Sequence, residues 1–190
     1  MNDLHHFLNT ITPITPETWN QVKELFTPLT LKKGAYFVEE GKKTIDFGFL
    51  QQGVIRAFYR NHEGIEYNKH FFTDKSMVGG FTSLVTQQPN KINQQALTDC
   101  TLLIGNYSKL VALLDEHQDL ERLLRKIAEN YFVKKEKREI EIVLLNATDR
   151  YTIFQKEYPT LEQLIPQYHI ASFLGITPTQ LSRIRNQIKK

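Results

Sequence analysis

The sequence predicts an α+β protein in which a β-rich part is followed by a helical part. From about residue 29 to residue 104 the chain is rich in Phe, Tyr, Val, Ile and Thr, and glycine recurs at short intervals, which is typical of short strands joined by turns. From residue 109 to residue 158 glycine and proline are absent, and Leu, Glu, Lys and Arg dominate. This composition favours helices.

Four segments of the β-rich part have the length and composition of strands. They are residues 35–38, 47–50, 53–59 and 101–104. Residues 61–64, with the sequence Asn-His-Glu-Gly, have the composition of a hairpin turn. Many short strands with glycine at their corners indicate a barrel or a jelly roll.

The helical part carries an apolar stripe on one face of a helix. Its members are Leu120, Leu123, Leu124, Ile127 and Tyr131. This face either docks on the β-rich part or pairs with its copy in a second subunit, and the residues leave both alternatives open. A second periodic set follows before Tyr158-Pro159 interrupts the pattern. It consists of Ile140, Val143, Leu144, Ala147, Tyr151 and Phe154, and we expect a domain boundary near Asn146.

Composition excludes several classes of protein. The formal net charge of +3 is too small to indicate a nucleic-acid partner by itself. The single cysteine, Cys100, excludes an internal disulfide, a four-cysteine zinc site and a cysteine-ligated iron–sulfur cluster within one chain. Since the first residues lack the pattern of a signal peptide and no apolar stretch is long enough to span a membrane, we expect a soluble, cytoplasmic protein with no membrane partner.

The C-terminal segment, residues 166–190, has the spacing of a helix-turn-helix. Two short helices that cross steeply need a small residue where they approach and a glycine where the first one ends, and Ala171 and Gly175 supply these. Thr177, Pro178 and Gln180 have the residue types of a cap, a first helical position and a capping box. The positions that should face the shared core are Ile170, Leu174, Ile176, Leu181 and Ile184. A helical hairpin without a nucleic-acid role is the alternative.

The exposed side of the second helix is suited to DNA. It carries side chains of the kind that read base edges, and these are Thr179, Gln180, Ser182, Arg183 and Asn186. Arg185, Lys189 and Lys190 follow as candidates for phosphate contacts, and Thr177 stands at the start of the same helix. Residues 177–190 contain four basic residues and no acid, so we predict double-stranded DNA as the partner.

The run His-Ile-Ala-Ser-Phe-Leu-Gly-Ile-Thr-Pro-Thr-Gln-Leu-Ser-Arg-Ile-Arg, residues 169–185, resembles the DNA-binding signature of the cyclic-AMP-receptor/FNR (Crp/Fnr) family of bacterial transcription regulators. The resemblance covers nearly the whole chain and implies that Thr179, Gln180 and Arg183 read bases and that Gln167 holds phosphate. It also implies a jelly roll of the cyclic-nucleotide-binding type. A homodimer joined along the helix near residues 120–131 would place two recognition helices on a near-palindromic site.

The same resemblance implies three domains. Residues 1–115 correspond to the sensor, 116–145 to a connecting and dimerisation helix, and 146–190 to the helix-turn-helix domain. RNA polymerase is a further implied partner. Members of the family usually continue past the recognition helix into a small β-wing, and because this chain stops at Lys190 we expect the wing to be missing.

The sensor part departs from family members that bind cyclic nucleotide. Gly80 stands where they have a glutamate for the ribose, and residues 86–93 contain no arginine for the phosphate. Lys91 would supply only a point charge. We therefore expect control by an unknown small ligand other than cyclic AMP, or by none. The candidate effector-binding residues are Gly79, Gly80, Phe81, Thr82 and Lys91.

No group of residues indicates catalysis. A jelly-roll metalloenzyme needs convergent His and Glu ligands, whereas the histidines are scattered along the chain, at His5, His6, His62, His70, His117 and His169. We expect no enzyme, no metal and no cofactor, and we expect Cys100 to be a small buried residue. The alternative from a different class is a small-molecule sensor or protein-interaction module without DNA binding.

Overall fold

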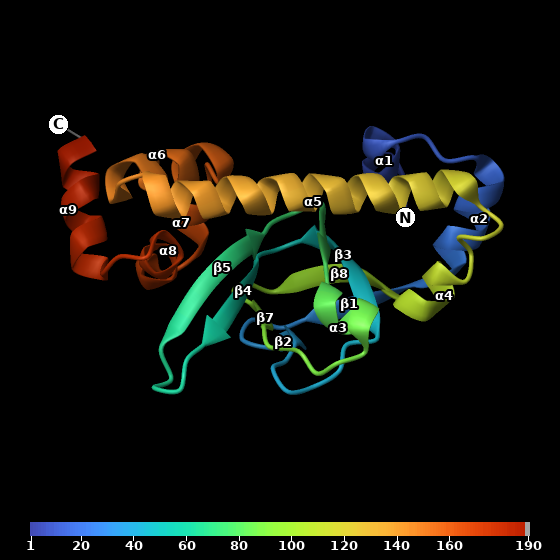
Figure 1. Cartoon of the computed structure of the whole chain (residues 1–190), viewed down its shortest axis with the longest axis horizontal. Helices are drawn as coiled ribbons and strands as arrows, with labels where there is room; N and C mark the ends of the chain where they lie inside the picture. The colour runs from blue at the N-terminus through green and yellow to red at the C-terminus, as the bar shows by residue number, and fades with distance from the viewer. Residues whose placement is uncertain (189–190) are drawn as a thin grey trace. The chain divides into compact units, whose positions relative to one another are not determined.

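The computed structural model describes residues 1–188 and confirms the predicted order of a β jelly roll, a long helix and a C-terminal helix-turn-helix (Figure 1). The chain divides into two compact units. Unit 1 comprises Met1–Ala57 and Phe71–Phe132, and unit 2 comprises Phe58–His70 and the described residues from Val133 onward. The hairpin of residues 58–70 therefore groups with the C-terminal helices, although it lies inside the segment 1–115 predicted as the sensor.

Two four-stranded sheets form the jelly roll. The first has the order β1 (Phe26–Leu31), β8 (Cys100–Asn106), β3 (Asp46–Gln52) and β6 (Ser76–Val78). The second has the order β2 (Tyr36–Val38), β7 (Asn93–Ala96), β4 (Ile55–Arg60) and β5 (Glu66–Phe72). The four strands predicted from the sequence are β2, β3, β4 and β8, and residues 61–64 form the turn between β4 and β5 as predicted.

Strand β3 is buried on both faces because its side chains alternate between two core clusters. Phe47 and Phe49 pack with helices of unit 1, whereas Leu50 packs with residues such as Ile55 and Phe72 of the second sheet. The strand pairs with β8 in an antiparallel register in which Leu50 lies opposite Leu102. Cys100 is buried in the cluster between the sheets, as expected.

Unit 1 begins with two helices that were not predicted from the sequence, α1 (Asn2–Ile11) and α2 (Pro16–Glu24). Their residues Leu4, Leu8 and Val22 are buried in the cluster that also holds Phe47 and Phe49. Both helices are short, and sequence reasoning considered this stretch only for the pattern of a signal peptide, which it lacks. Two further short helices complete the unit, α3 (Phe81–Thr86) and α4 (Tyr107–Val111).

The first part of the long helix α5 (Gln118–Leu144) docks on unit 1. Leu120 and Leu123 are each 1% exposed, Leu124 and Ile127 pack against the same cluster, and the Tyr131 hydroxyl donates to the Met77 carbonyl at 2.8 Å. Leu120 and Leu123 thus follow the docking alternative, whereas pairing of this helix with a second copy stays a prediction. No helix in residues 1–188 is both long and apolar enough to cross a membrane.

Unit 2 contains the rest of α5 and four shorter helices. These are α6 (Ala147–Glu157), α7 (Leu161–Leu164), α8 (Gln167–Leu174) and α9 (Pro178–Ile188). Asn146 separates α5 from α6, and its side-chain oxygen accepts from the amides of Thr148 and Asp149 as a helix cap. The helix break thus lies at Asn146, whereas the two compact units meet between Phe132 and Val133, inside α5, and not at the boundary expected near Asn146.

Candidate nucleic-acid interface

Helices α8 and α9 form the predicted helix-turn-helix (Figure 1). Helix α8 ends at Gly175, which has φ 69° and ψ 34°, a left-handed conformation that glycine adopts without a steric penalty. Helix α9 begins after Thr177, whose hydroxyl accepts from the Gln180 amide at 3.2 Å. Of the predicted core positions Ile176 is half-buried, and the buried ones are Ile170, Ala171, Leu174, Leu181 and Ile184.

The side of α9 that faces away from this core is exposed and polar. The exposed members of the predicted set are Gln167, Thr177, Thr179, Gln180, Ser182, Arg183 and Asn186. Gln180 and Arg183 also line an open hollow of about 500 Å³, together with Ile184, Gln187 and the first turn of α6 from Asn146 to Asp149. The side chains that sequence reasoning assigned to base contacts are therefore accessible on one helix.

The three predicted phosphate contacts that follow the base-reading positions differ from them. Arg185 lies 3.8 Å from the Glu162 carboxylate, and the Arg185 side chain is only 22% exposed. This arginine is therefore held against its own domain and is less available to DNA than Arg183. Lys189 and Lys190 lie outside the described residues.

Two arginines that sequence reasoning missed hold the end of α8. The Arg138 guanidinium of α5 donates to the Phe173 carbonyl and lies 4.0 Å from the centre of the Phe173 ring. Arg150 of α6 donates to the Leu174 carbonyl through two nitrogens, at 3.2 and 3.0 Å. The last carbonyls of a helix have no partners within it and carry partial negative charge, so these cations stabilise the turn before α9. In the sequence both resemble ordinary basic residues on exposed helix faces.

The predicted effector position in unit 1 is occupied by the chain's own amide side chains. Gln94 accepts from the Gly79 amide at 3.1 Å and donates to the Gly79 carbonyl at 2.8 Å. Asn90 donates to the Lys42 carbonyl and the Thr44 hydroxyl, at 2.7 and 2.6 Å. Both amides are buried, with Gln94 2% and Asn90 5% exposed. Internal hydrogen bonds therefore join Asn90 to the loop before β3 and Gln94 to Gly79.

A carboxylate side chain has no room at Gly80. A Cβ atom there would lie 2.2 Å from the Asn90 Oδ1 atom and 2.9 Å from the Thr44 hydroxyl oxygen. The other predicted effector residues, Phe81, Thr82 and Lys91, are exposed. The structure thus gives a reason for the missing glutamate, because its place is taken by Asn90.

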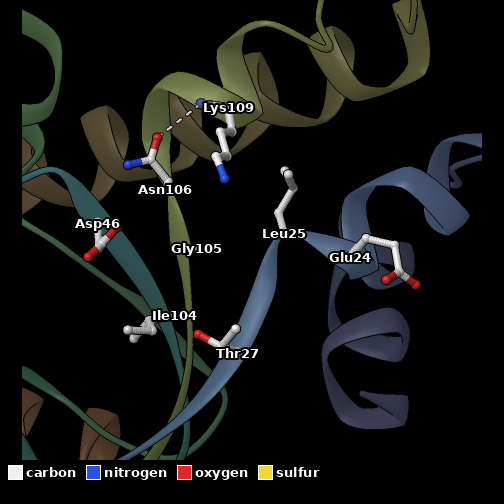
Figure 2. Close-up of a pocket in the computed structure, with 8 residues that line it drawn as sticks. All are labelled: Glu24, Leu25, Thr27, Asp46, Ile104, Gly105, Asn106 and Lys109. Carbon is white, nitrogen blue, oxygen red and sulfur yellow. Dashed lines mark hydrogen bonds between the residues drawn. The ribbon is translucent and has the colours of Figure 1, made fainter.

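Unit 1 also has a hollow of about 280 Å³ at another place, where α2, β1, β3, β8 and α4 meet (Figure 2). Figure 2 shows the Asp46 and Glu24 carboxylates on opposite sides of it and the Lys109 side chain between them. Asn106 is bound internally, since its Oδ1 accepts from the Lys109 amide at 3.1 Å. Sequence reasoning did not single out these residues, and their mixed charge is that of a solvated surface.

The residues with potential for metal binding remain scattered. Among residues 1–188, no three His, Cys, Asp or Glu side chains are grouped in a way that could hold a metal ion. His117 and His169 are buried and contact Thr18 and Asn68, respectively.

Comparisons with known proteins agree with this geometry. Residues 28–117 match the family model of the cyclic nucleotide-binding domain. FixK2 from Bradyrhizobium japonicum is similar in structure, with a TM-score of 0.76 and 16% identity over 86% of this chain and 84% of that one. A CooA variant from Carboxydothermus hydrogenoformans has a TM-score of 0.71 and 16% identity, over 93% and 86% of the two chains.

A third similar structure is described as a transcriptional regulator of the crp/fnr family from Eubacterium rectale. It has a TM-score of 0.73 and 15% identity, over 95% of this chain and 88% of that one. At these identities the likeness is one of fold. No curated protein sequence matches the chain.

Proposed function

We propose that this protein is a DNA-binding regulator of transcription. Its residues 28–117 match the cyclic nucleotide-binding domain, and the chain has the fold of Crp/Fnr regulators. It acts as a homodimer on a near-palindromic site. The observation that carries the proposal is the exposed face of α9, which holds Gln180 and Arg183 beside a complete helix-turn-helix core. Such a face presents donors and acceptors to base edges in the major groove.

The surface for a second subunit is the later part of α5. Phe132, Ile140 and Val143 share one face, because separations of 8 and 11 residues from Phe132 return to the same side of a helix. They are 67%, 52% and 79% exposed, and Val133 and Leu144 extend the patch. A soluble monomer rarely exposes such a contiguous apolar face. A symmetric pairing of α5 with its copy would cover it.

Cyclic AMP does not control DNA binding in this proposal, because the chain lacks the charged groups that would bind it. The ribose and phosphate of a cyclic nucleotide would need charged partners, and at this position the chain has Gly80 and the bonded amides of Asn90 and Gln94 instead. DNA binding is therefore controlled by a ligand of another kind or by the amount of protein.

Selection of DNA fragments from a random pool by the purified chain tests the function. We expect enrichment of an inverted repeat whose affinity falls steeply with salt. Arg183→Ala should lower the affinity for the enriched site about tenfold or more, since an arginine-to-base contact contributes about 1–3 kcal/mol. Arg122→Ala, at an exposed position in unit 1, is the matched control.

An enriched sequence without two-fold symmetry would contradict the dimer on a palindrome. A pool that shows no enrichment at low salt would contradict DNA binding altogether and favour a sensor or interaction module.

A further inference from the structure

Strand β5 lies at the edge of its sheet, where backbone groups on the outer side have no neighbouring strand. In the hairpin of residues 58–70 the hydroxyl of Ser172 bonds to two of these outer backbone groups. The Ser172 Oγ of α8 accepts from the Asn68 amide at 3.0 Å and donates to the Glu66 carbonyl at 2.8 Å. One side chain of the helix-turn-helix therefore makes the pair of hydrogen bonds that a neighbouring strand would make.

The Asn68 side chain adds a second attachment to α8. Its amide nitrogen donates to the His169 carbonyl at 2.8 Å and lies 3.3 Å from the His169 Nδ1 atom. Both side chains are buried, with Asn68 6% and His169 4% exposed. If Asn68 donates both amide hydrogens, His169 is the tautomer protonated on Nε2. Buried amides with satisfied bonds hold one geometry, because any other geometry leaves polar groups unpaired.

We propose that Asn68 and Ser172 form a clamp that positions the recognition helix for DNA, an inference that rests on the proposed function. Helix α8 shares a buried core with α9, through residues such as Leu174 and Leu181, so the place of α8 sets the place of α9. The clamp leaves Arg183 exposed and is therefore compatible with a bound state.

The later part of α5, which carries the proposed surface for a second subunit, belongs to the same compact unit as the clamp and α9. Two recognition helices must lie about one turn of DNA apart to read both half-sites. A helix held by the clamp tolerates few half-site spacings, whereas a released helix tolerates more.

Binding to the inverted repeat enriched by the wild-type chain, and to versions with one or two base pairs added or removed between the half-sites, tests the clamp. We expect the wild-type chain to prefer one spacing sharply. Ser172→Ala should lower the affinity at this spacing about tenfold, for the loss of two hydrogen bonds, and should flatten the preference. Ser172→Thr retains the hydroxyl and should restore both. Thr152→Ala is the control, because this exposed hydroxyl bonds only to its own helix.

Hydrogen exchange of the Asn68 amide reports whether the clamp has opened, and it should accelerate in Ser172→Ala only. If exchange accelerates while the sharp spacing preference remains, the positioning role is overturned and DNA binding stands. An equal loss of affinity at every spacing would mean that Ser172 contributes only to stability, and it would overturn the clamp as well. A wild-type chain that enriches no DNA would overturn the proposed function and the clamp with it.

Discussion

Single residues in unit 2 have environments that their sequence neighbours do not reveal. His70 of β5 lies 3.4 Å from the hydroxyl of Tyr158, the residue that follows α6. Burial, together with the positive charges of Lys134, Lys69 and Arg138, lowers the pKa of His70 from 6.5 to about 4. This histidine is therefore neutral in the folded protein over the physiological range.

The lowered pKa makes the stability of unit 2 depend on pH. Above pH 6.5 His70 is neutral in both states and has no effect. As the pH falls from 6.5 to 4, His70 is protonated in the unfolded state but stays neutral in the folded state. The free energy of unfolding therefore decreases, by roughly 2 kcal/mol at pH 5. Thermal unfolding of the wild-type chain and of His70→Gln between pH 7 and pH 5 measures this effect. An equal pH dependence in both proteins would show that His70 is not its source.

At the scale of elements, the first and last turns of α5 make different contacts. Its first turns bury Leu120 and Leu123 in unit 1, and its last turns place Arg138 at the end of α8 while Val143 stays exposed. Periodicity in the sequence marked both apolar stretches, but it did not distinguish an internal contact from a free surface. Only the packing of unit 1 shows that the earlier stretch is already used.

Val143→Glu should convert the proposed dimer into a monomer without unfolding the chain. The side chain is 79% exposed in the single chain, so a carboxylate there is solvated in the monomer but buried at a paired α5 surface, where it would cost several kcal/mol. Light scattering after size exclusion gives the mass, and circular dichroism checks the fold. Ile142→Glu, on a different face of the same helix, should remain dimeric. Dimers of the Val143 variant at micromolar concentration would place the interface elsewhere.

At the scale of the whole molecule, the chain combines the outline of a nucleotide sensor with internal bonds where the ligand would be. Gly79 is bonded to Gln94, and the space beside Gly80 is filled by Asn90. Internal hydrogen bonds therefore hold these segments of unit 1 together.

Gly80→Glu should destabilise unit 1 and should not create a nucleotide site. The new Cβ would displace the Asn90 amide from its two hydrogen bonds, which would lower the free energy of unfolding by roughly 1–3 kcal/mol. Denaturant unfolding measures the loss, and adding Asn90→Ala to this variant should recover part of it. Cyclic AMP should leave the melting temperature of the wild-type chain unchanged, since a ligand that binds the folded state raises it. A higher melting temperature at millimolar cyclic AMP would show that the hydrogen bonds of Asn90 and Gln94 do not prevent nucleotide binding.

Local signals in the sequence were enough for the elements and for the output end of the molecule. The strands with glycine corners, the cap at Thr177 and the turn at Gly175 depend on neighbouring residues alone, so periodicity and residue type predicted them. The departure at Gly80 was also readable as a missing charge. Helices α1 and α2 were missed although Leu4, Phe7, Leu8 and Ile11 recur at helical spacing, because this stretch was considered only as a signal peptide. The pairing role of the 120–131 stripe stays a prediction, because periodicity does not identify what an apolar face touches.

The tertiary structure decided how these elements are joined. Ser172 meets the backbone of Asn68 across 104 residues of sequence, Arg138 meets Phe173 across 35, and Asn90 fills the space beside Gly80. Such contacts follow from strand register and helix packing, which place remote residues within hydrogen-bond distance, and neither quantity is encoded in a local window. The sequence by itself determined that a helix-turn-helix with a polar, acid-free face ends this chain. Only the folded chain determined that a strand edge holds its first helix, because that bond requires both partners in place.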